Sequence, residues 1–485
     1  MDFWKLLQDF WHYGVAALTV FLSLIASGHA LLHKRESRAA VSWVGFVWLV
    51  PLVGAVLYFI FGVNRIKRRA VELRGQTEHF HSPCSTEPCP PATLAEWLPR
   101  DASHLAALAT VVDRVAGQPL LPGNLIEPLV NGDAAYPAML DAIASARASI
   151  TLSTYIFDRD EAGLAFARAL GDAVRRGVLV RVLIDATGTR YSWPSILRVL
   201  RREKIPYGRF LPAFALWRLM SMNLRNHRKT LIIDGRLGFT GGMNIRVGNW
   251  LSKHPRSPVQ DIHFRVEGPV VAQLQEIFAD DWGFTTREEI RGPLWFPPLE
   301  RGGPVLARAL ADGPNDDTDP LRWSILAGLA VAKHSVRIVT PYFLPDPPVI
   351  SALNLAAMRG VRVDIILPSK CNLPFVLWAS RAQWWQVLAL GCRIWLTPPP
   401  FDHSKLMLVD GAWSLVGSAN WDPRSLRLNF ELNLECYDPA LASKLEQIIA
   451  EKLRTAREVT LAEVDGRTLP SKLRDGAARL LAPYL

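Results

Sequence analysis

Two long apolar stretches open the chain. Residues 14–32 include a single ionisable side chain, His29, and residues 39–63 include no charged residue. A helix needs about 20 apolar residues to cross the hydrocarbon core of a bilayer, and both stretches reach that length. The pattern predicts a membrane anchor over residues 1–75, in which two helices, about 12–32 and 40–62, form a transmembrane hairpin.

Other interpretations of these stretches are less consistent with the sequence. Soluble domains rarely contain uncharged runs of this length, which disfavours a pair of core helices. A cleaved signal peptide would begin with basic residues, whereas the chain begins Met-Asp-Phe-Trp-Lys. A shallow hairpin that enters and leaves one leaflet stays open. Basic residues flank both runs and narrowly favour a cytoplasmic body: Lys5, Lys34, Arg35, Arg38, Arg65, Lys67, Arg68 and Arg69.

After a proline-containing stretch, residues 76–123, which we interpret as a linker, one pattern occurs twice. Each copy contains a helix, an apolar strand, a helix ending in glycine, and a second apolar strand. The copies cover residues 142–188 and 328–370, with Tyr155 matching Tyr342 and Gly177 matching Gly360. Strands that alternate with helices indicate parallel pairing in an α/β fold. The duplication predicts two lobes, residues 124–300 and 301–485, related by a pseudo-twofold axis.

A polar motif also occurs once in each half. Residues 226–235 read NHRKTLIIDG and residues 402–411 read DHSKLMLVDG. A turn of small residues with asparagine follows each motif, at 241–244 and 417–420. One such match could arise by chance, but two with the same downstream turn indicate a shared site. The motif residues are His227, Lys229 and Asp234 in the first half and His403, Lys405 and Asp410 in the second.

These residue types suit phosphoryl transfer. Residues two apart on a strand point to the same side, so each histidine and lysine are expected to project together. Each aspartate lies five residues beyond its lysine and is expected to support the turn. One imidazole can attack phosphorus while the other protonates the leaving oxygen. Lysine and amide groups can bind the phosphate oxygens, and no acidic cluster for Mg²⁺ accompanies the motifs, so neither metal nor cofactor is expected. The expected phosphate-binding residues are Asn244, Ser418 and Asn420.

The two motifs resemble the HKD motifs of the phospholipase D superfamily, over roughly residues 124–440. Within it the chain is similar to bacterial cardiolipin synthases in its anchor (34–62), DWGF (281–284) and VGSANWDPRSLRLNFELN (416–433). The resemblance implies two phospholipase D-like lobes and a covalent phosphatidyl-histidine intermediate. It also implies condensation of two phosphatidylglycerol molecules into cardiolipin and glycerol.

The resemblance further implies an acidic residue that orients each histidine. Counted from the histidine of the same half, Glu431 lies 28 residues after His403 and Asp261 lies 34 residues after His227. Similar enzymes are usually drawn with the first-half histidine as nucleophile. That would make His227 attack and His403 the general acid, although the sequence alone leaves this order open.

Composition indicates which class of partner the chain binds. A formal net charge of +10 indicates an anionic partner, and the anchor favours anionic phospholipids at a membrane over nucleic acid. The five cysteines form no disulfide framework. We therefore expect an enzyme of the bacterial cytoplasmic membrane, multi-pass, with its lobes facing the cytoplasm and no known protein partner.

Several alternatives remain for these regions. The chain could instead be a membrane-bound phospholipase D that passes the intermediate to water, a nucleic-acid-cleaving relative, or an inactive binding protein. A zinc site formed by His79, His81, Cys84 and Cys89 is weighed against a flexible linker. Residues 218–225, 373–378 and 384–385 could contact the membrane interface or belong to the core.

Overall fold

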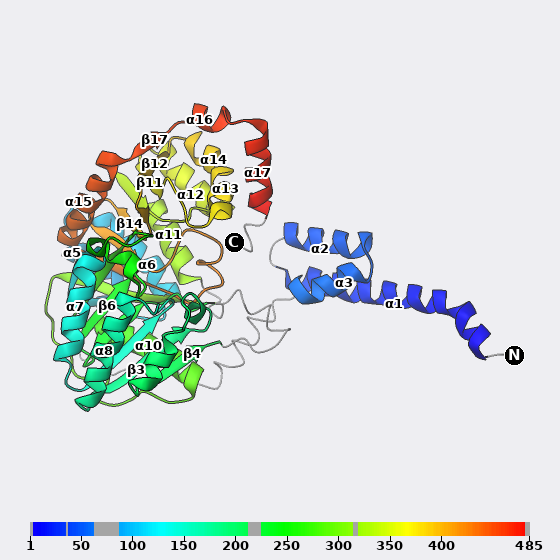
Figure 1. Cartoon of the computed structure of the whole chain (residues 1–485). Coiled ribbons are helices and arrows are strands. Elements are labelled where there is room, and N and C mark those ends of the chain that lie inside the picture. The colour runs from blue at the N-terminus through cyan, green and yellow to red at the C-terminus, as the bar shows by residue number, and fades with distance from the viewer. Residues whose placement is uncertain (1–2, 35–36, 63–86, 212–224, 314–318, 481–485) are drawn as a thin grey trace. The chain divides into compact units, whose positions relative to one another are not determined.

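The computed structural model describes residues 3–34, 37–62, 87–211, 225–313 and 319–480. In it the described chain divides into an N-terminal unit, residues 3–62, and a larger body from residue 87 onward (Figure 1). Each is described by itself.

The N-terminal unit contains one helix of spanning length. Helix α1 (Phe3–His33) is long and apolar enough to cross a bilayer over Trp11–His33, the only such helix among the described residues. The second apolar stretch is broken instead into α2 (Ser37–Leu49), α3 (Val53–Leu57) and a π-helical turn, Tyr58–Gly62. The predicted second spanning helix, and with it the two-helix transmembrane hairpin, is therefore wrong.

The break occurs at Pro51. Proline has no N–H to continue the helical ladder and its ring clashes with the preceding turn, and Leu52 adopts a φ of 65°. The chain turns so sharply that a side chain at Gly54 would lie 2.8 Å from the carbonyl oxygen of Phe46. Polar groups of this unit pair with one another, as His29 Nδ1 does with the Tyr58 hydroxyl at 2.7 Å.

Much of the predicted linker is folded. Residues 91–115 form α5 (Pro91–Trp97), a 3₁₀ turn (Ser103–Leu105) and α6 (Ala106–Val115). Their leucines, such as Leu94 and Leu108, are buried in the core of the second half. The prediction of a linker is therefore wrong for residues 91–115. Of the proposed metal ligands, His79, His81 and Cys84 lie outside the described residues, and Cys89 is buried.

One mixed sheet of 15 strands runs through the body. The strands of the first half are β1 (Leu121–Val130), β2 (Ser149–Thr154), β3 (Leu179–Asp185), β4 (Tyr207–Phe210), β5 (Thr230–Ile233), β6 (Leu237–Gly241) and β8 (Ile262–Glu267). Those of the second are β9 (Val305–Asp312), β10 (Ser335–Val339), β11 (Arg362–Pro368), β12 (Arg393–Thr397), β14 (Leu406–Val409), β15 (Trp413–Gly417), β16 (Glu431–Tyr437) and β17 (Arg457–Val459). A separate small sheet pairs β7 (Val259–Gln260) with β13 (Phe401–Asp402).

The strand order confirms the duplication. From the middle of the sheet outward the first half runs β1-β8-β6-β5-β2-β3-β4, and the second runs β9-β16-β15-β14-β10-β11-β12 with β17 added at the edge. Strands β1 and β9, which are equivalent, pair antiparallel where the halves meet. Within the described part of this sheet only β2-β3-β4 and β10-β11-β12 are parallel, so the expected parallel pairing holds for three strands of each half.

Helices flank this sheet (Figure 1). In the first half they are α7 (Asn131–Ser145), α8 (Glu161–Arg175), α9 (Leu197–Arg202) and α10 (Val270–Thr286), with short 3₁₀ turns at Gly188–Arg190, Val247–Asn249 and Leu251–Lys253. In the second they are α11 (Pro320–Val331), α12 (Pro347–Met358), α13 (Pro374–Arg381), α14 (Trp384–Leu388), α15 (Pro439–Thr455), α16 (Leu461–Asp465) and α17 (Leu469–Leu480). One buried cluster contains Phe264 and Ile232 of the first half together with Leu406 and Leu432 of the second. The halves therefore share a core, which fixes one against the other.

Candidate active site

The two histidine segments lie immediately before strands, not on them. Strand β5 begins at Thr230 and β14 at Leu406, so the histidine and lysine of each motif precede the predicted strand. Both segments are hydrogen bonded to the opposite half. The backbone N–H of His227 donates to the Phe430 carbonyl at 2.9 Å, and that of His403 donates to the Gln260 carbonyl at 2.7 Å. The opposite half therefore holds each histidine in place.

The orienting carboxylates are exchanged between the halves. Nδ1 of His227 lies 3.3 Å from Oε1 of Glu431, and Nδ1 of His403 lies 2.8 Å from Oδ2 of Asp261. The sequence had related each carboxylate to the histidine of its own half, and this pairing is wrong. Both carboxylates are fully buried, whereas the two imidazoles keep 20% and 19% of their surface exposed. The imidazoles are thus accessible from outside while their partners are not.

Burial sets the protonation state of the imidazoles. It lowers the pKa of His403 to about 4, with a further contribution from the nearby Lys405. It also lowers the pKa of His227, although Glu431 acts in the opposite direction. Burial would raise the pKa of Glu431, but its interactions with His227 and Lys229 lower it overall. Near neutral pH the free site therefore contains neutral imidazoles, the form in which a histidine is nucleophilic.

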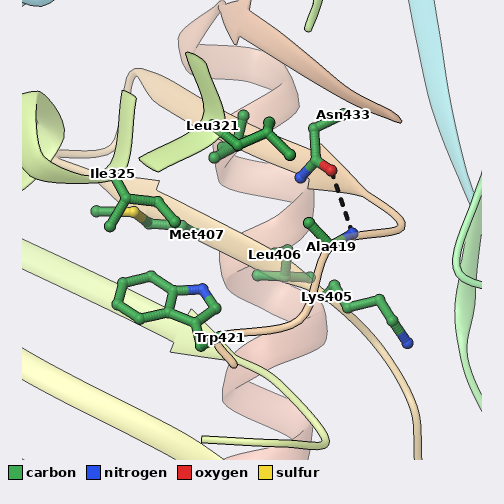
Figure 2. A pocket seen from close by; sticks show the side chains of 9 residues that line it. Leu321, Ile325, Lys405, Leu406, Met407, Ala419, Trp421 and Asn433 are labelled. Carbon is green, nitrogen blue, oxygen red and sulfur yellow. Dashed lines mark hydrogen bonds between the residues drawn. The ribbon is translucent and has the colours of Figure 1, made fainter. Parts of the chain in front are cut away.

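The two lysines lie deeper than the histidines. Lys229 and Lys405 are only 3% and 5% exposed. Each Nζ donates a hydrogen bond to the carbonyl of the histidine two residues earlier. A small pocket beside Lys405 is lined mainly by apolar side chains, among them Ile325, Met407 and Trp421 (Figure 2). Burial lowers the pKa of both lysines, that of Lys405 to about 7. An anion that enters the site would meet ammonium groups that are poorly solvated.

The pKa of Lys405 predicts an alkaline limit for activity. Above about pH 7 the amine loses its proton in the free enzyme and no longer attracts a phosphate, so kcat/KM should fall as pH rises. In Lys405→Arg the guanidinium stays charged, and the limit should move to higher pH at a reduced rate. Profiles of kcat/KM between about pH 6 and 9.5 measure this. Lys253→Arg, at a surface lysine, is the control, and a profile unchanged by Lys405→Arg would contradict the prediction.

The motif residues of the two halves act on one another. Lys229 of the first half contributes to the lowered pKa values of His403 and Lys405. Asp261 and Glu431 both act on each lysine. Two histidines, two lysines and two carboxylates that are far apart in the chain therefore form one electrostatic unit.

The motif aspartates lie elsewhere, at the far ends of β5 and β14. Asp234 accepts hydrogen bonds from the backbone N–H groups of Ala148 and Ser149 at 2.7 and 2.9 Å. Asp410 accepts from those of residues 333–335 at 2.8 Å each. Both have positive φ, 51° and 50°. They fix the starts of β2 and β10, in agreement with the supporting role expected for them.

We expect Asp234→Ala to weaken the fold more than the chemistry. The change removes the acceptor of three backbone N–H groups at residues 147–149 and should cost about 2 kcal/mol of unfolding free energy. Thermal unfolding and the rate per folded molecule, measured together, separate the two effects. Asp172→Ala, at a surface carboxylate, should leave the melting temperature unchanged. A rate loss as large as that of a histidine variant in fully folded protein would contradict the assignment.

The predicted phosphate-binding residues differ in what they contact. Oδ1 of Asn244 accepts from the Ile156 N–H at 3.0 Å, and Nδ2 of Asn420 donates to Ser425 at 3.1 Å. The Ser418 hydroxyl donates to Oε2 of Glu431 at 2.6 Å. That hydrogen is directed at the carboxylate, so Ser418 supports Glu431 rather than a bound phosphate. At the equivalent Gly242 a side chain would lie 2.4 Å from Oδ1 of Asp261.

Three residues of the site were missed by the sequence reasoning. Nδ2 of Asn429 lies 3.1 Å from Oε1 of Glu431 and 3.3 Å from Nδ1 of His227. The Tyr155 ring lies 4.4 Å from the His227 ring, centroid to centroid. Arg228 is buried and pairs with Asp281 of DWGF at 2.8 Å. The match of Tyr155 to Tyr342 was a visible signal for the tyrosine, whereas Asn429 has no counterpart at Val259 in the first half.

The family follows from comparison with known proteins. The model described as "Cardiolipin synthase, PLD-like domain" matches residues 139–282 and 325–453. Over 465 residues the chain is 33% identical to cardiolipin synthase A of Pseudomonas putida KT2440, which covers 96% of each chain. It belongs to the cardiolipin synthases of the phospholipase D superfamily, a family of phosphatidyltransferases. Cardiolipin synthase A of Pseudomonas fluorescens Pf-5 is 32% identical over 469 residues, 97% of each chain.

Two further matches concern the N-terminal unit and the fold. The model "Phospholipase D-nuclease N-terminal" matches residues 21–62 and so covers the end of α1, α2 and α3. The crystal structure of phosphatidylserine synthase from Haemophilus influenzae superposes with a TM-score of 0.61. It covers 78% of this chain and all of that one at 14% sequence identity. The cardiolipin synthase chain thus shares its fold with a second phospholipid synthase.

Proposed function

We propose that the chain joins two phosphatidylglycerol molecules into cardiolipin and releases glycerol, through a phosphatidyl group carried on His227. The observation that supports this most directly is the pair of partly exposed imidazoles, each held by a buried carboxylate of the opposite half.

In the first step Nε2 of His227 attacks the phosphorus of one phosphatidylglycerol. The bond between phosphorus and the terminal glycerol oxygen breaks, and His403 gives that oxygen a proton. His403 is neutral in the free site, but the negative charge of a bound phosphodiester favours its protonated form and raises its pKa. The proton is therefore taken up when substrate binds. Lys229 and Lys405 can neutralise the charge that accumulates on the non-bridging oxygens.

In the second step the headgroup hydroxyl of another phosphatidylglycerol attacks the phosphorus. His403, now neutral, accepts the proton of that hydroxyl, and the bond from phosphorus to Nε2 of His227 breaks. Cardiolipin leaves, His403 releases the proton to solvent, and both histidines return to the neutral form of the free site. Glu431 holds Nδ1 of His227 and stabilises the positive charge that the imidazole carries as the intermediate, as buried carboxylates do beside catalytic histidines.

A single assay tests this function. Purified full-length protein in phosphatidylglycerol vesicles is expected to yield cardiolipin and glycerol in equal amounts. Phosphatidic acid without cardiolipin would mean that water accepts the phosphatidyl group, and the chain would then act as a phospholipase D. Activity on DNA without activity on lipid would support the nucleic-acid-cleaving alternative.

The proposal places the enzyme in the bacterial cytoplasmic membrane, with α1 as its anchor. A multi-pass arrangement requires the broken stretch 39–62 to cross as well. We favour one crossing by α1, with α2 and α3 entering and leaving the same side. All seven basic residues of the 34–38 loop and the 65–69 exit then lie on one side and only Lys5 on the other, which favours a cytoplasmic body more clearly than a hairpin does.

The two topologies differ in the position of the N-terminus. With one crossing it is expected in the periplasm, and with two it is in the cytoplasm. A cysteine placed before Phe3 and treated with a membrane-impermeant thiol reagent in intact cells distinguishes them. Labelling without lysis supports the single crossing, and labelling only after lysis supports the hairpin. A cysteine in the cytoplasmic body is the matched control.

A further inference from the structure

Two loops approach the catalytic histidines from equivalent places in the two halves. One follows β3 and contains Tyr191, whose hydroxyl lies 3.5 Å from that of Tyr155, the tyrosine beside His227. The other follows β11 and contains Asn372, which accepts a hydrogen bond from Tyr342 at 2.8 Å. The Tyr342 ring lies 6.3 Å from that of His403. We call residues 190–193 and 370–375 the rim.

The two parts of the rim lie close to each other. Burial raises the pKa of Tyr342 of the second half well above its usual value, and Tyr191 of the first half is among the smaller contributors. The rim therefore lies near both imidazoles, since each tyrosine that contacts the rim also lies against one of the two histidines.

Large apolar side chains of the rim face outward. Trp193 is 87% exposed, Tyr191 is 56%, Phe375 is 55% and Leu373 is 47%. Isolated apolar residues are normal on a protein surface, but a group of them around a site indicates a contact. Tryptophan and tyrosine are enriched where proteins meet the headgroup layer of a bilayer.

The two segments that contain the rim carry only positive charges. Residues 186–202 and 365–401 contain no aspartate or glutamate. Arg190, Arg198 and Lys370 are exposed, and the Arg198 guanidinium lies over the Trp193 ring at 5.5 Å. A surface that combines exposed aromatic and basic side chains is complementary to an anionic phospholipid surface.

We propose that the rim inserts into the headgroup layer of an anionic bilayer and admits phosphatidylglycerol to the histidines directly from the membrane surface. The contact is additional to the anchor, and its role in catalysis rests on the proposed function. It explains how a site whose substrates are both membrane lipids receives their phosphates without extracting whole lipids into water.

The contact itself is tested by fluorescence quenching, which does not depend on activity. Full-length protein is reconstituted in phosphatidylglycerol vesicles with and without bromine on the acyl chains near the headgroup. Trp193→Phe should remove a quenched component of the emission, and Trp97→Phe, at a 53% exposed tryptophan on α5, should not. Replacing phosphatidylglycerol by phosphatidylcholine should weaken the Trp193 component. Equal quenching in the wild type and Trp193→Phe would overturn the proposal.

The catalytic consequence is tested with two forms of the substrate. The double variant Trp193→Ala/Phe375→Ala should lose about tenfold in rate on vesicles and keep its rate on monomeric dihexanoyl phosphatidylglycerol. Trp97→Ala/Trp323→Ala, at two other exposed tryptophans, is the matched control. An equal loss on both substrates would overturn the proposal. So would a wild-type dimer that becomes a monomer in the double variant while Trp193 shows no quenching, because the rim would then be a contact between two copies. Wild-type protein inactive on both substrates would refute the proposed function, while quenching would still test the contact.

Discussion

Replacing His227 by alanine is expected to reduce cardiolipin formation by at least about 10⁴-fold, because the nucleophile of a covalent mechanism has no substitute in the site. His403→Ala should cause a smaller loss of about 10² to 10⁴-fold, since a general acid can be partly replaced by water. Steady-state formation of cardiolipin from labelled phosphatidylglycerol, with the protein shown to be folded, measures both. Cardiolipin formation at the wild-type rate in either variant would exclude the motifs as the reaction centre.

The two variants also differ in a way that identifies the nucleophile. His403→Ala keeps the attacking imidazole, so it should still form the phosphatidyl-enzyme and accumulate it. His227→Ala should form none. Quenching with denaturant near neutral pH, which spares the acid-labile phosphorus–nitrogen bond, followed by mass spectrometry of peptides containing residues 227 and 403 detects the adduct. A phosphatidyl group on His403 would reverse the assigned order while leaving the proposed reaction intact.

Glu431→Gln is expected to impair the step that belongs to His227, although Glu431 lies in the half of His403. The neutral amide accepts the Nδ1–H hydrogen bond more weakly than a carboxylate and cannot stabilise a charged imidazole. Comparable changes beside catalytic histidines cost about 10² to 10⁴-fold in rate. Asp261→Asn should correspondingly impair His403. Rapid-quench measurement of phosphatidyl-enzyme separates the two: Glu431→Gln should slow its formation, and Asp261→Asn should let it accumulate.

Matched variants sharpen this test of the exchanged pairs. Ser418→Ala removes the hydroxyl that donates to Oε2 of Glu431 at 2.6 Å. It should slow formation of the phosphatidyl-enzyme as Glu431→Gln does, but by a smaller factor. Because the glutamate and His227 act as one unit, the double variant His227→Ala/Glu431→Gln should lose no more than His227→Ala alone. If Glu431→Gln let the adduct accumulate, each carboxylate would serve the histidine of its own half.

The residues of the site could be predicted from the sequence because the chain repeats them. Two occurrences of His-x-Lys with the same downstream turn identify the histidines and lysines without any knowledge of the fold. The supporting role of Asp234 was also expected from the sequence, although the reason differs: strand β5 (Thr230–Ile233) separates Lys229 from Asp234, which lies at its far end. Ser418 was misassigned because spacing relates a residue to its neighbours in the chain and not to the carboxylate that fills the space beside it.

The membrane anchor and the linker show two structural features that residue composition alone does not predict. Hydropathy measures whether residues 39–63 are apolar but not whether their backbone is continuous, and Pro51 interrupts it. Residues 91–115 contain enough proline nearby to resemble a linker, yet their leucines form a stripe that is buried in the second half. Whether a short amphipathic helix finds a surface to cover depends on the rest of the fold.

The sequence by itself determined that the motif side chains occur in two matching sets, and it predicted which of them react and that a membrane is their setting. The tertiary structure decided the pairing of those side chains. Strands β1 and β9 join the halves in one sheet, and the backbone at His227 then bonds to Phe430, next to Glu431, while that at His403 bonds to Gln260, next to Asp261. Contacts across this junction join residues more than 140 positions apart. Their geometry depends on the packing of the shared core, which local patterns do not encode.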